Sequence, residues 1–186
     1  MTSPMRDALQ ALDLRLFRLL NQDGGPALDH VMQLVTTRTF GLVFGLLMAG
    51  LLVIALRREA ARVLLALGVA LLMSDFLAWH LLRPLWPRHR PCYVLPPGSV
   101  RWLAPAADVP SLPSLHASNM FALAWVVAWA RPRLAPLAFA AAVLVAASRV
   151  YVGVHWPADV VAGALWGSVA GATGWAVARA VRPRAS

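Results

Sequence analysis

The hydrophobic positions of this chain gather in five apolar segments, separated by short stretches rich in arginine and proline. Residues 39–56 contain no charged side chain, and an α-helix needs about 20 apolar residues to cross the hydrocarbon core of a bilayer. The other apolar segments cover residues 63–82, 113–130, 134–154 and 160–178. We therefore predict an all-α integral membrane helical bundle with about five transmembrane helices.

Residues 1–38 show a different pattern, in which leucines recur at helical spacing and polar residues take other positions on the helical wheel. The leucines are Leu9, Leu12, Leu16 and Leu19, and the polar residues are Asp13, Arg15 and Arg18. This pattern favours an amphipathic helix at the membrane interface, broken by residues 21–26. The segment lacks the basic start and central apolar core of a cleavable signal, so we expect the protein to keep its N-terminus.

Composition agrees with a membrane protein and argues against nucleic acid as a partner. The chain has 186 residues, 60% of them hydrophobic, with a mean hydropathy of +0.65, which predicts a single membrane-embedded domain over residues 1–186. The net charge is +9, and all 17 basic residues are arginine. These arginines fall at the ends of apolar runs and not along one face, so membrane topology explains them better than nucleic-acid binding. With one cysteine, Cys92, the chain has no intrachain disulfide.

Two apolar segments carry unusual residues. Asp75 and His80 lie in the second segment, where an ionisable group is costly and marks a candidate functional site. We favour a structural role for Asp75, facing Arg83 or a polar network between helices. Glycines recur every four residues in the fifth segment, and this ridge predicts close approach by another helix; they are Gly163, Gly167 and Gly171.

Residues 83–112 form the longest polar stretch, and seven prolines prevent a continuous helix there. Such a loop is able to fold as a lid or rim over a site. Trp86 and Trp102 suit the level of the lipid headgroups, where a belt of amphipathic rings is common.

The densest group of chemically active residues follows the fourth segment. Arg149 lies six residues before His155, and His155 lies four before Asp159. Pro157 suits the first turn of a helix, which would hold Asp159 close to the His155 ring. A carboxylate on one imidazole nitrogen fixes the tautomer and leaves the other nitrogen free to attack. The alternative interpretation is a structural Arg–Asp pair with a capping histidine.

Two further motifs complete a pattern that resembles the type 2 phosphatidic acid phosphatase family of membrane lipid phosphatases. The first is Arg83-x6-Arg90-Pro91, and the second is Pro113-Ser114-Leu115-His116 at the start of an apolar segment. With Ser148-Arg149-x5-His155-x3-Asp159 they stand in the order of that family. The chain departs from the family twice, with arginine for the usual lysine at Arg83 and leucine for the usual glycine at Leu115.

The three arginines suit a phosphoryl group, because each guanidinium fork binds two oxygens at once. Arg83, Arg90 and Arg149 would hold the phosphate. Ser114 and the backbone amides around Leu115 would add donors at a helix start, where an anion is favoured.

The resemblance implies a mechanism without a metal ion or a cofactor. By this resemblance, His155 attacks phosphorus to give a phosphohistidine, Asp159 orients its ring, and His116 protonates the leaving oxygen and then activates water. The outer face has no His-x3-His pair or acidic cluster that would suggest a metal site.

Charge along the chain predicts on which side of the membrane this site lies. Eight arginines against one acid, Glu59, fall in residues 57–62, residues 131–133 and the C-terminal tail: Arg57, Arg58, Arg62, Arg131, Arg133, Arg179, Arg182 and Arg184. By the positive-inside rule this face is cytoplasmic, and all three motifs then reach the outer face. Five arginines also lie on the outer face, but arginines that hold phosphate are poor markers of topology.

We therefore predict a phosphatase in the bacterial inner membrane that acts on a lipid phosphate, with undecaprenyl diphosphate favoured by analogy with bacterial carrier-recycling members of the family. Phosphatidylglycerol phosphate, phosphatidic acid and the phosphates of lipid A are alternative substrates. Vanadate-dependent haloperoxidases share the three motifs but are larger and soluble. A transporter or a non-catalytic protein that binds anionic lipid would use the same arginines, yet its function would survive loss of His155. The sequence does not indicate an oligomeric state.

Overall fold

The computed structural model describes residues 3–181, and all regular structure in that range is helical. The helices are α1 (Ser3–Leu20), α2 (Gly25–Val35), α3 (Arg38–Leu56), α4 (Ala60–Leu71), a π-helix (Leu72–Leu82), α5 (Arg83–Leu85), α6 (Pro91–Val94), α7 (Leu115–Ala130), α8 (Ala135–Tyr151) and α9 (Pro157–Ala180). Short 3-10 turns cover Arg57–Glu59 and Pro132–Leu134. The predicted all-α class is confirmed.

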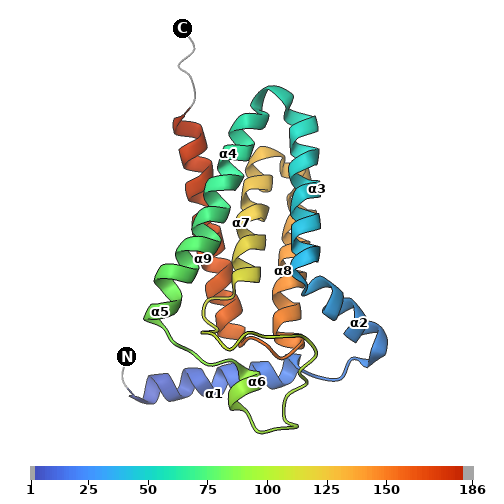
Figure 1. Ribbon diagram of the computed structural model, residues 1–186, viewed down its shortest axis with the longest axis vertical. Coiled ribbons are helices and arrows are strands. Elements are labelled where there is room, and N and C mark those ends of the chain that lie inside the picture. The colour runs from blue at the N-terminus through green and yellow to red at the C-terminus, as the bar shows by residue number, and fades with distance from the viewer. Residues whose placement is uncertain (1–2, 182–186) are drawn as a thin grey trace.

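The long helices stand side by side as a bundle, and α1 lies across one end of it (Figure 1). Within residues 3–181, three helical stretches are long and apolar enough to cross a membrane: 38–85, 132–151 and 157–180. The first stretch is a hairpin, because the chain reverses between α3 and α4 at residues 57–59 (Figure 1). Helix α7 is a shorter apolar helix. The predicted multi-pass membrane bundle therefore agrees with the structure.

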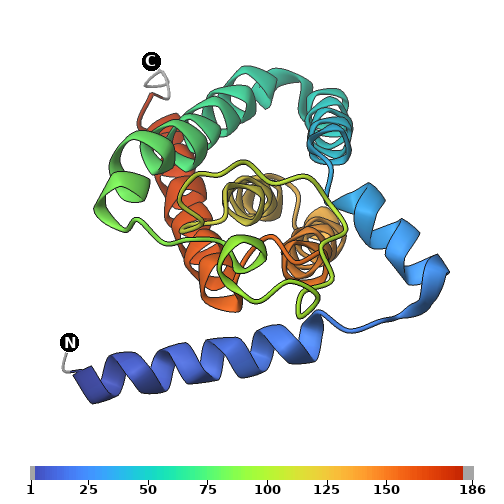
Figure 2. The same cartoon turned by 60° about the horizontal axis from the view of Figure 1, so that its bottom comes forward.

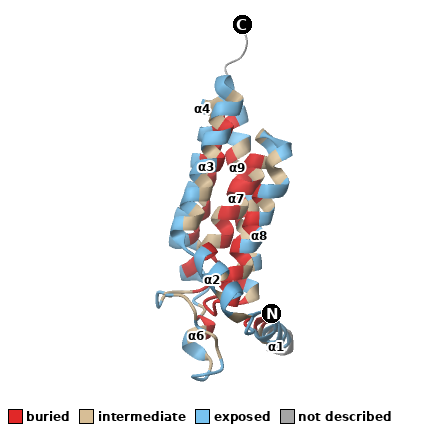
Figure 3. Cartoon of the chain, turned by 90° about the vertical axis from the view of Figure 1, so that its right-hand side faces the viewer, coloured by how far each residue is buried: buried red, intermediate tan, exposed pale blue. Residues whose placement is uncertain are grey.

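The core follows α7, which packs against α4, α8 and α9. Figure 3 shows the buried residues along the inner faces of these helices and exposed residues on the outer faces of α3 and α4. Val126 and Val127 are fully buried, whereas Leu42, Leu46 and Ile54 on α3 are more than 60% exposed. A bilayer accepts such an apolar exterior, because lipid tails are as apolar as leucine.

The glycine ridge of α9 lies directly against the backbone of α7. A Cβ atom on Gly163 would collide with the carbonyl oxygen of Ser114, and one on Gly167 would collide with that of Ser118. A Cβ on Gly171 would lie 2.9 Å from the Ala122 oxygen. The predicted close approach of another helix to this ridge is confirmed, and it fixes the start of α7 against α9.

We expect Gly167→Ala to destabilise the protein by about 1–3 kcal/mol, because the added methyl meets backbone and not a flexible side chain. The matched control is Gly50→Ala on α3, where a Cβ meets nothing within 4 Å and helix propensity rises. Thermal unfolding in detergent micelles, followed by circular dichroism, compares the two midpoints. Equal midpoints would contradict the packing described for α9.

The N-terminal segment forms two helices where the sequence predicted one and a break. Helix α1 has the predicted amphipathic form, with Leu9, Leu12 and Leu19 more than 50% exposed. Helix α2 was not predicted; it begins within the predicted break at residues 21–26, and Pro26 takes its first turn, where the missing N–H costs nothing.

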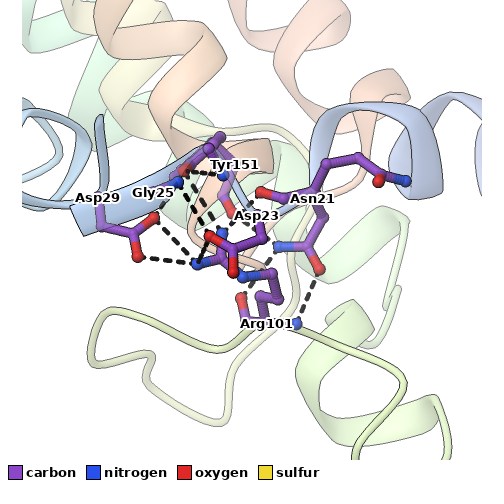
Figure 4. Close-up of polar contacts among 8 residues, drawn as sticks. Asn21, Asp23, Gly25, Asp29, Arg101 and Tyr151 are labelled. Carbon is purple, nitrogen blue, oxygen red and sulfur yellow. Dashed lines mark hydrogen bonds and ion pairs between the residues drawn. The ribbon is translucent and has the colours of Figure 1, made fainter. Parts of the chain in front are cut away.

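A polar cluster ties the linker between α1 and α2 to the end of α8 (Figure 4). The Asn21 side-chain amide donates to the carbonyl oxygens of Tyr151 at 2.6 Å and of Arg101 at 2.9 Å. Asp29 accepts from the Tyr151 hydroxyl at 2.6 Å and from the Arg101 guanidinium at 2.8 Å. These two donors hold the pKa of Asp29 below its usual value. Arg101 also pairs with Asp23 at 3.2 Å, so the cluster holds the 83–112 loop against α8.

The second apolar segment runs further than predicted, through the π-helix into α5. Residues 83–112 contain no continuous helix, as the prolines predicted; Pro84 occupies the first turn of the short helix α5 and Pro91 that of α6. Asp75, in the π-helix, accepts from the Asn119 amide at 3.1 Å. Next to it, the hydroxyls of Ser74 and Ser118 lie 2.7 Å apart, so Asp75 belongs to a polar network between two helices.

Candidate active site

The three sequence motifs meet at the end of the bundle that α1 crosses. Figure 2 shows the loop that follows α5 passing over the ends of α7 and α8. Hydrogen bonds and electrostatic interactions bring together Arg83, Arg90, Ser114, His116, Arg149, His155 and Asp159, and Leu115 stands between Ser114 and His116. Ser114 directly precedes α7, Leu115 begins it, and Arg149 lies in the last turn of α8. Helix ends therefore supply most of the site.

The turn between α8 and α9 sets the position of His155. Gly153 has a φ of +82°, which glycine adopts without strain, and a Cβ there would lie 2.5 Å from the Arg101 carbonyl oxygen. The amides of Val154 and His155 both donate to the Arg149 carbonyl oxygen at 3.2 Å. Pro157 begins α9 as predicted, so that Asp159 stands one turn after His155.

His155 lies between a carboxylate and a guanidinium. Its Nδ1 lies 3.3 Å from Asp159 Oδ2, and its Nε2 lies 2.9 Å from a terminal nitrogen of Arg90. Because arginine has no acceptor, Nε2 must accept and Nδ1 must carry the proton that points to Asp159. The same Asp159 oxygen accepts from the Trp156 amide at 2.9 Å. This tautomer leaves the lone pair of Nε2 on the side of the arginines.

Burial keeps the His155 ring neutral. The residue is only 1% exposed, and burial lowers the pKa of His155 to about 3, with the positive charges of Arg149 and Arg90 acting in the same direction and Asp159 opposing them. At neutral pH the ring is therefore uncharged, as a nitrogen nucleophile must be.

Three arginines of the motifs are buried, each less than 8% exposed; Arg90 and Arg149 act on His155, and Arg83 acts on Arg90 and Asp159. Arg90 donates to the carbonyl oxygens of Ala107 at 3.0 Å and Val154 at 2.9 Å. Arg149 donates to the Thr36 hydroxyl at 2.7 Å and carbonyl at 3.1 Å. Arg83 lies over the Trp79 ring, 4.7 Å from its centroid. Arg90 acts electrostatically on both other arginines. Because buried like charges repel one another, a bound anion would stabilise the three arginines.

Several buried polar atoms of this site have no hydrogen-bond partner within the described chain. They are Nε of Arg83, Nε of Arg149, Oγ of Ser114, Oγ of Ser111 and Nε2 of His116. Buried polar groups are nearly always paired, so each such atom needs an explanation. Four of the five belong to residues predicted from the motifs, and together they suit a ligand with several acceptor oxygens.

The amide of Ser114 is already used, because it donates to the Asp159 backbone oxygen at 3.0 Å. This amide is one of those at the start of α7 that were proposed to bind phosphate, and its hydrogen bond to Asp159 makes it unavailable to a ligand. The bond ties α7 to α9 at the point where Ser114 and His116 enter the site.

Four residues of this region were not assigned from the sequence. Arg88 donates to Asp159 Oδ1 at 3.0 Å and pairs with Asp13, Thr36 holds Arg149, and Ser111 has an unpaired hydroxyl. Asp13 was placed on the polar side of α1, but it is 6% exposed and faces the protein. Its spacing from Phe17, four residues later and fully buried, is the signal that indicates a protein-facing stripe on α1.

A family model and a curated relative match most of the chain. The family model described as PAP2 superfamily matches residues 59–183. The Escherichia coli (strain K12) protein named "Putative undecaprenyl-diphosphatase YbjG" is 33% identical over 164 residues, covering 87% of this chain and 80% of that protein.

Two crystal structures have the same fold. Aquifex aeolicus LpxE superposes with a TM-score of 0.73 at 29% identity, covering 88% of this chain and 94% of the other. The first transmembrane PAP2 type phosphatidylglycerolphosphate phosphatase from Bacillus subtilis gives a TM-score of 0.67 at 22% identity, covering 96% and 90%. The second likeness concerns the fold alone.

Proposed function

Because this chain belongs to the PAP2 superfamily and is a membrane phosphatase, we propose that it hydrolyses a lipid phosphate or diphosphate through a phosphohistidine on His155, without a metal ion. One observation carries the proposal: unpaired buried donors of Arg83, Ser114 and Arg149 lie in the site of a neutral histidine. Fixed donors of this kind stabilise the charge on the equatorial oxygens of a transferring phosphoryl group.

In the first step, the phosphate oxygens accept hydrogen bonds from the guanidinium groups, and Arg90 turns from His155 Nε2 to the substrate. The Nε2 lone pair then forms a bond to phosphorus while the bond from phosphorus to the leaving oxygen breaks. The negative charge of the bound phosphate favours the positively charged form of His116, and the leaving oxygen takes its proton, which leaves His116 neutral. Asp159 stabilises the positive charge that the His155 ring acquires.

In the second step, water attacks the phosphohistidine. His116 accepts a proton from the water as its oxygen bonds to phosphorus, and the bond from phosphorus to Nε2 breaks. Phosphate leaves, and His155 returns to its neutral form. Each histidine thus ends the cycle in the protonation state in which it began.

An apolar groove of about 350 Å³ beside the site supports a lipid substrate. Its walls come from the end of the π-helix, from the residue after α5, from the residues before Ser114 and from α9: Leu82, Trp86, Leu112, Pro113, Ala162, Leu165, Trp166 and Val169. Leu82 precedes Arg83, and Pro113 precedes Ser114, so a chain in this groove would have its phosphate among the proposed phosphate ligands. We propose that the first part of the lipid tail lies here.

We expect Ala162→Trp, which fills this groove, to raise KM for a long-chain lipid phosphate about tenfold, or ~1.4 kcal/mol, with kcat little changed. The matched control is Val161→Trp, one residue earlier on α9 and 58% exposed outside the groove. Kinetics are measured with the lipid in micelles and with a water-soluble aryl phosphate. Equal KM values for the lipid in the two variants would contradict the tail assignment.

We propose five membrane crossings, by α3, by α4 with the π-helix, and by α7, α8 and α9. The turns at residues 57–59 and 132–134 lie at the end opposite the site (Figure 1), and arginines cluster there, which favours that end as cytoplasmic. Two of the counted arginines, Arg182 and Arg184, lie outside the described residues. The site would then face the periplasm or exterior of a bacterial inner membrane.

For the substrate we propose undecaprenyl diphosphate, converted to undecaprenyl phosphate. The name of the Escherichia coli relative supports this choice. Phosphatidylglycerol phosphate, phosphatidic acid and lipid A phosphates are the competing substrates, and the Bacillus subtilis structure is named for the first of these.

The test is phosphate release by the purified protein in micelles with excess chelator, comparing these four lipids. We expect chelator-resistant release, fastest from undecaprenyl diphosphate. A faster rate on another lipid would overturn the substrate, and loss of release on chelation that zinc or magnesium restores would overturn the metal-free mechanism.

A further inference from the structure

Arg88 links the interfacial helix α1 to the carboxylate beside His155. One terminal nitrogen of Arg88 donates to Asp159 Oδ1 at 3.0 Å, and the other pairs with Asp13 on α1. The second oxygen of Asp13 accepts from the Ala158 amide at 2.9 Å, in the first turn of α9. Asp13 therefore holds both the arginine and the helix start that carries Asp159.

The contact between α1 and the site is packed as well as charged. Phe17, one turn after Asp13, is fully buried, and its ring lies 5.3 Å from that of Trp156. The Arg88 guanidinium lies over the same Trp156 ring, 5.1 Å from its centroid. Leu14 joins this contact, whereas Leu9, Leu12, Leu16 and Leu19 are exposed. One face of α1 therefore suits the bilayer surface, and the other closes on the site.

The two oxygens of Asp159 are divided between different partners. Oδ2 faces His155 and the Trp156 amide, and Oδ1 faces Arg88. Arg88 thus fixes the rotation of the carboxylate. Without Asp13, Asp159 alone would balance the positive charge of Arg88. The Asp159 carboxylate would then stabilise a positively charged His155 ring less.

On the basis of the proposed function, we propose that Arg88 and Asp13 are positioning residues for the reaction. Asp13 neutralises and orients Arg88, Arg88 orients Asp159, and Asp159 aligns and stabilises His155. Beside Arg88 lies a cleft of about 310 Å³, lined in part by Gln10, Leu14 and Trp156. It gives the guanidinium room to turn away from Asp159 when Asp13 no longer holds it. The interfacial helix is in this way a part of the active site.

The test compares Asp13→Asn and Arg88→Gln with the wild type in the phosphate-release assay. We expect kcat to fall about tenfold in Asp13→Asn and ten- to hundredfold in Arg88→Gln, with KM within twofold, because neither residue is proposed to contact substrate. Arg88→Lys restores one donor and should recover part of kcat. The matched control, Asp23→Asn, removes another N-terminal carboxylate that pairs with an arginine, Arg101, and should keep kcat.

A double variant separates positioning from general destabilisation. Asp13→Asn keeps an oxygen that can accept from the Ala158 amide and removes the charge that pairs with Arg88. Adding it to Arg88→Gln should therefore lower kcat less than twofold further, whereas independent effects would multiply. An unchanged kcat in a folded Arg88→Gln protein, a rise in KM alone, or multiplying effects would each overturn the inference. Wild type and His155→Ala in the same assay test the proposed function separately, because they do not depend on Arg88.

Discussion

His155→Ala is expected to lower the rate of phosphate release by at least about 10³-fold, the scale seen when a nucleophile is removed. The neutral Nε2 of His155 is the nitrogen that faces the arginines, and with the ring gone the phosphoryl group has no acceptor. The variant should also lose the acid-labile, base-stable label that a phosphohistidine gives when the enzyme is quenched during turnover of a labelled substrate.

Removing a fully buried ring also leaves a cavity, so folding must be checked separately. His155→Gln keeps most of the side-chain volume and a hydrogen-bond donor for Asp159, and it should be as inactive as His155→Ala while unfolding closer to the wild-type midpoint. His30→Ala, at an exposed histidine on α2, is the matched control and should keep full activity. Release that persists in both His155 variants would mean that water attacks phosphorus directly.

The bundle was predictable because its signal is local. Five uncharged or nearly uncharged runs bounded by arginine and proline correspond to α3, α4 with the π-helix, α7, α8 and α9. The turn that carries His155 was also predictable from the sequence, since Pro157 starts α9 and a four-residue spacing places Asp159 on the same face as the histidine. Each of these features depends on residues less than about two turns apart.

The contacts that hold the site from outside were not predictable from such patterns. Arg88 reaches Asp159 across 71 positions of the chain, and Asp13 reaches Ala158 across 145, so both depend on where α1 docks. Arg149 and Thr36 are 113 positions apart. The π-helix left no trace in hydropathy, because hydropathy follows residue type and the apolar run continues through Leu72–Leu82 whichever backbone hydrogen bonds form.

Arg149→Lys is expected to lower kcat/KM about 10²–10³-fold, the cost of losing one fixed donor to a developing charge. The guanidinium is divided between two tasks: its NH1 donates to the hydroxyl and carbonyl of Thr36, and its Nε has no partner within the described chain. A lysine ammonium cannot do both, because it lacks the planar fork. Arg131→Lys, at an exposed arginine between α7 and α8, is the matched control and should change kcat/KM by less than twofold.

Thr36→Val tests whether the hydrogen bond from Arg149 to the Thr36 hydroxyl matters for the rate. This change removes the hydroxyl that accepts at 2.7 Å but keeps the carbonyl and the volume, so the arginine stays buried while its orientation loosens. We expect kcat/KM to fall about tenfold, which is less than in Arg149→Lys. When the two changes are combined, the result should match Arg149→Lys alone, since Thr36 acts only through the fork of Arg149. A lower kcat/KM in the double variant than in Arg149→Lys would show that Thr36 also supports the site without Arg149. The junction of α2 and α3 would then do more than orient this one arginine.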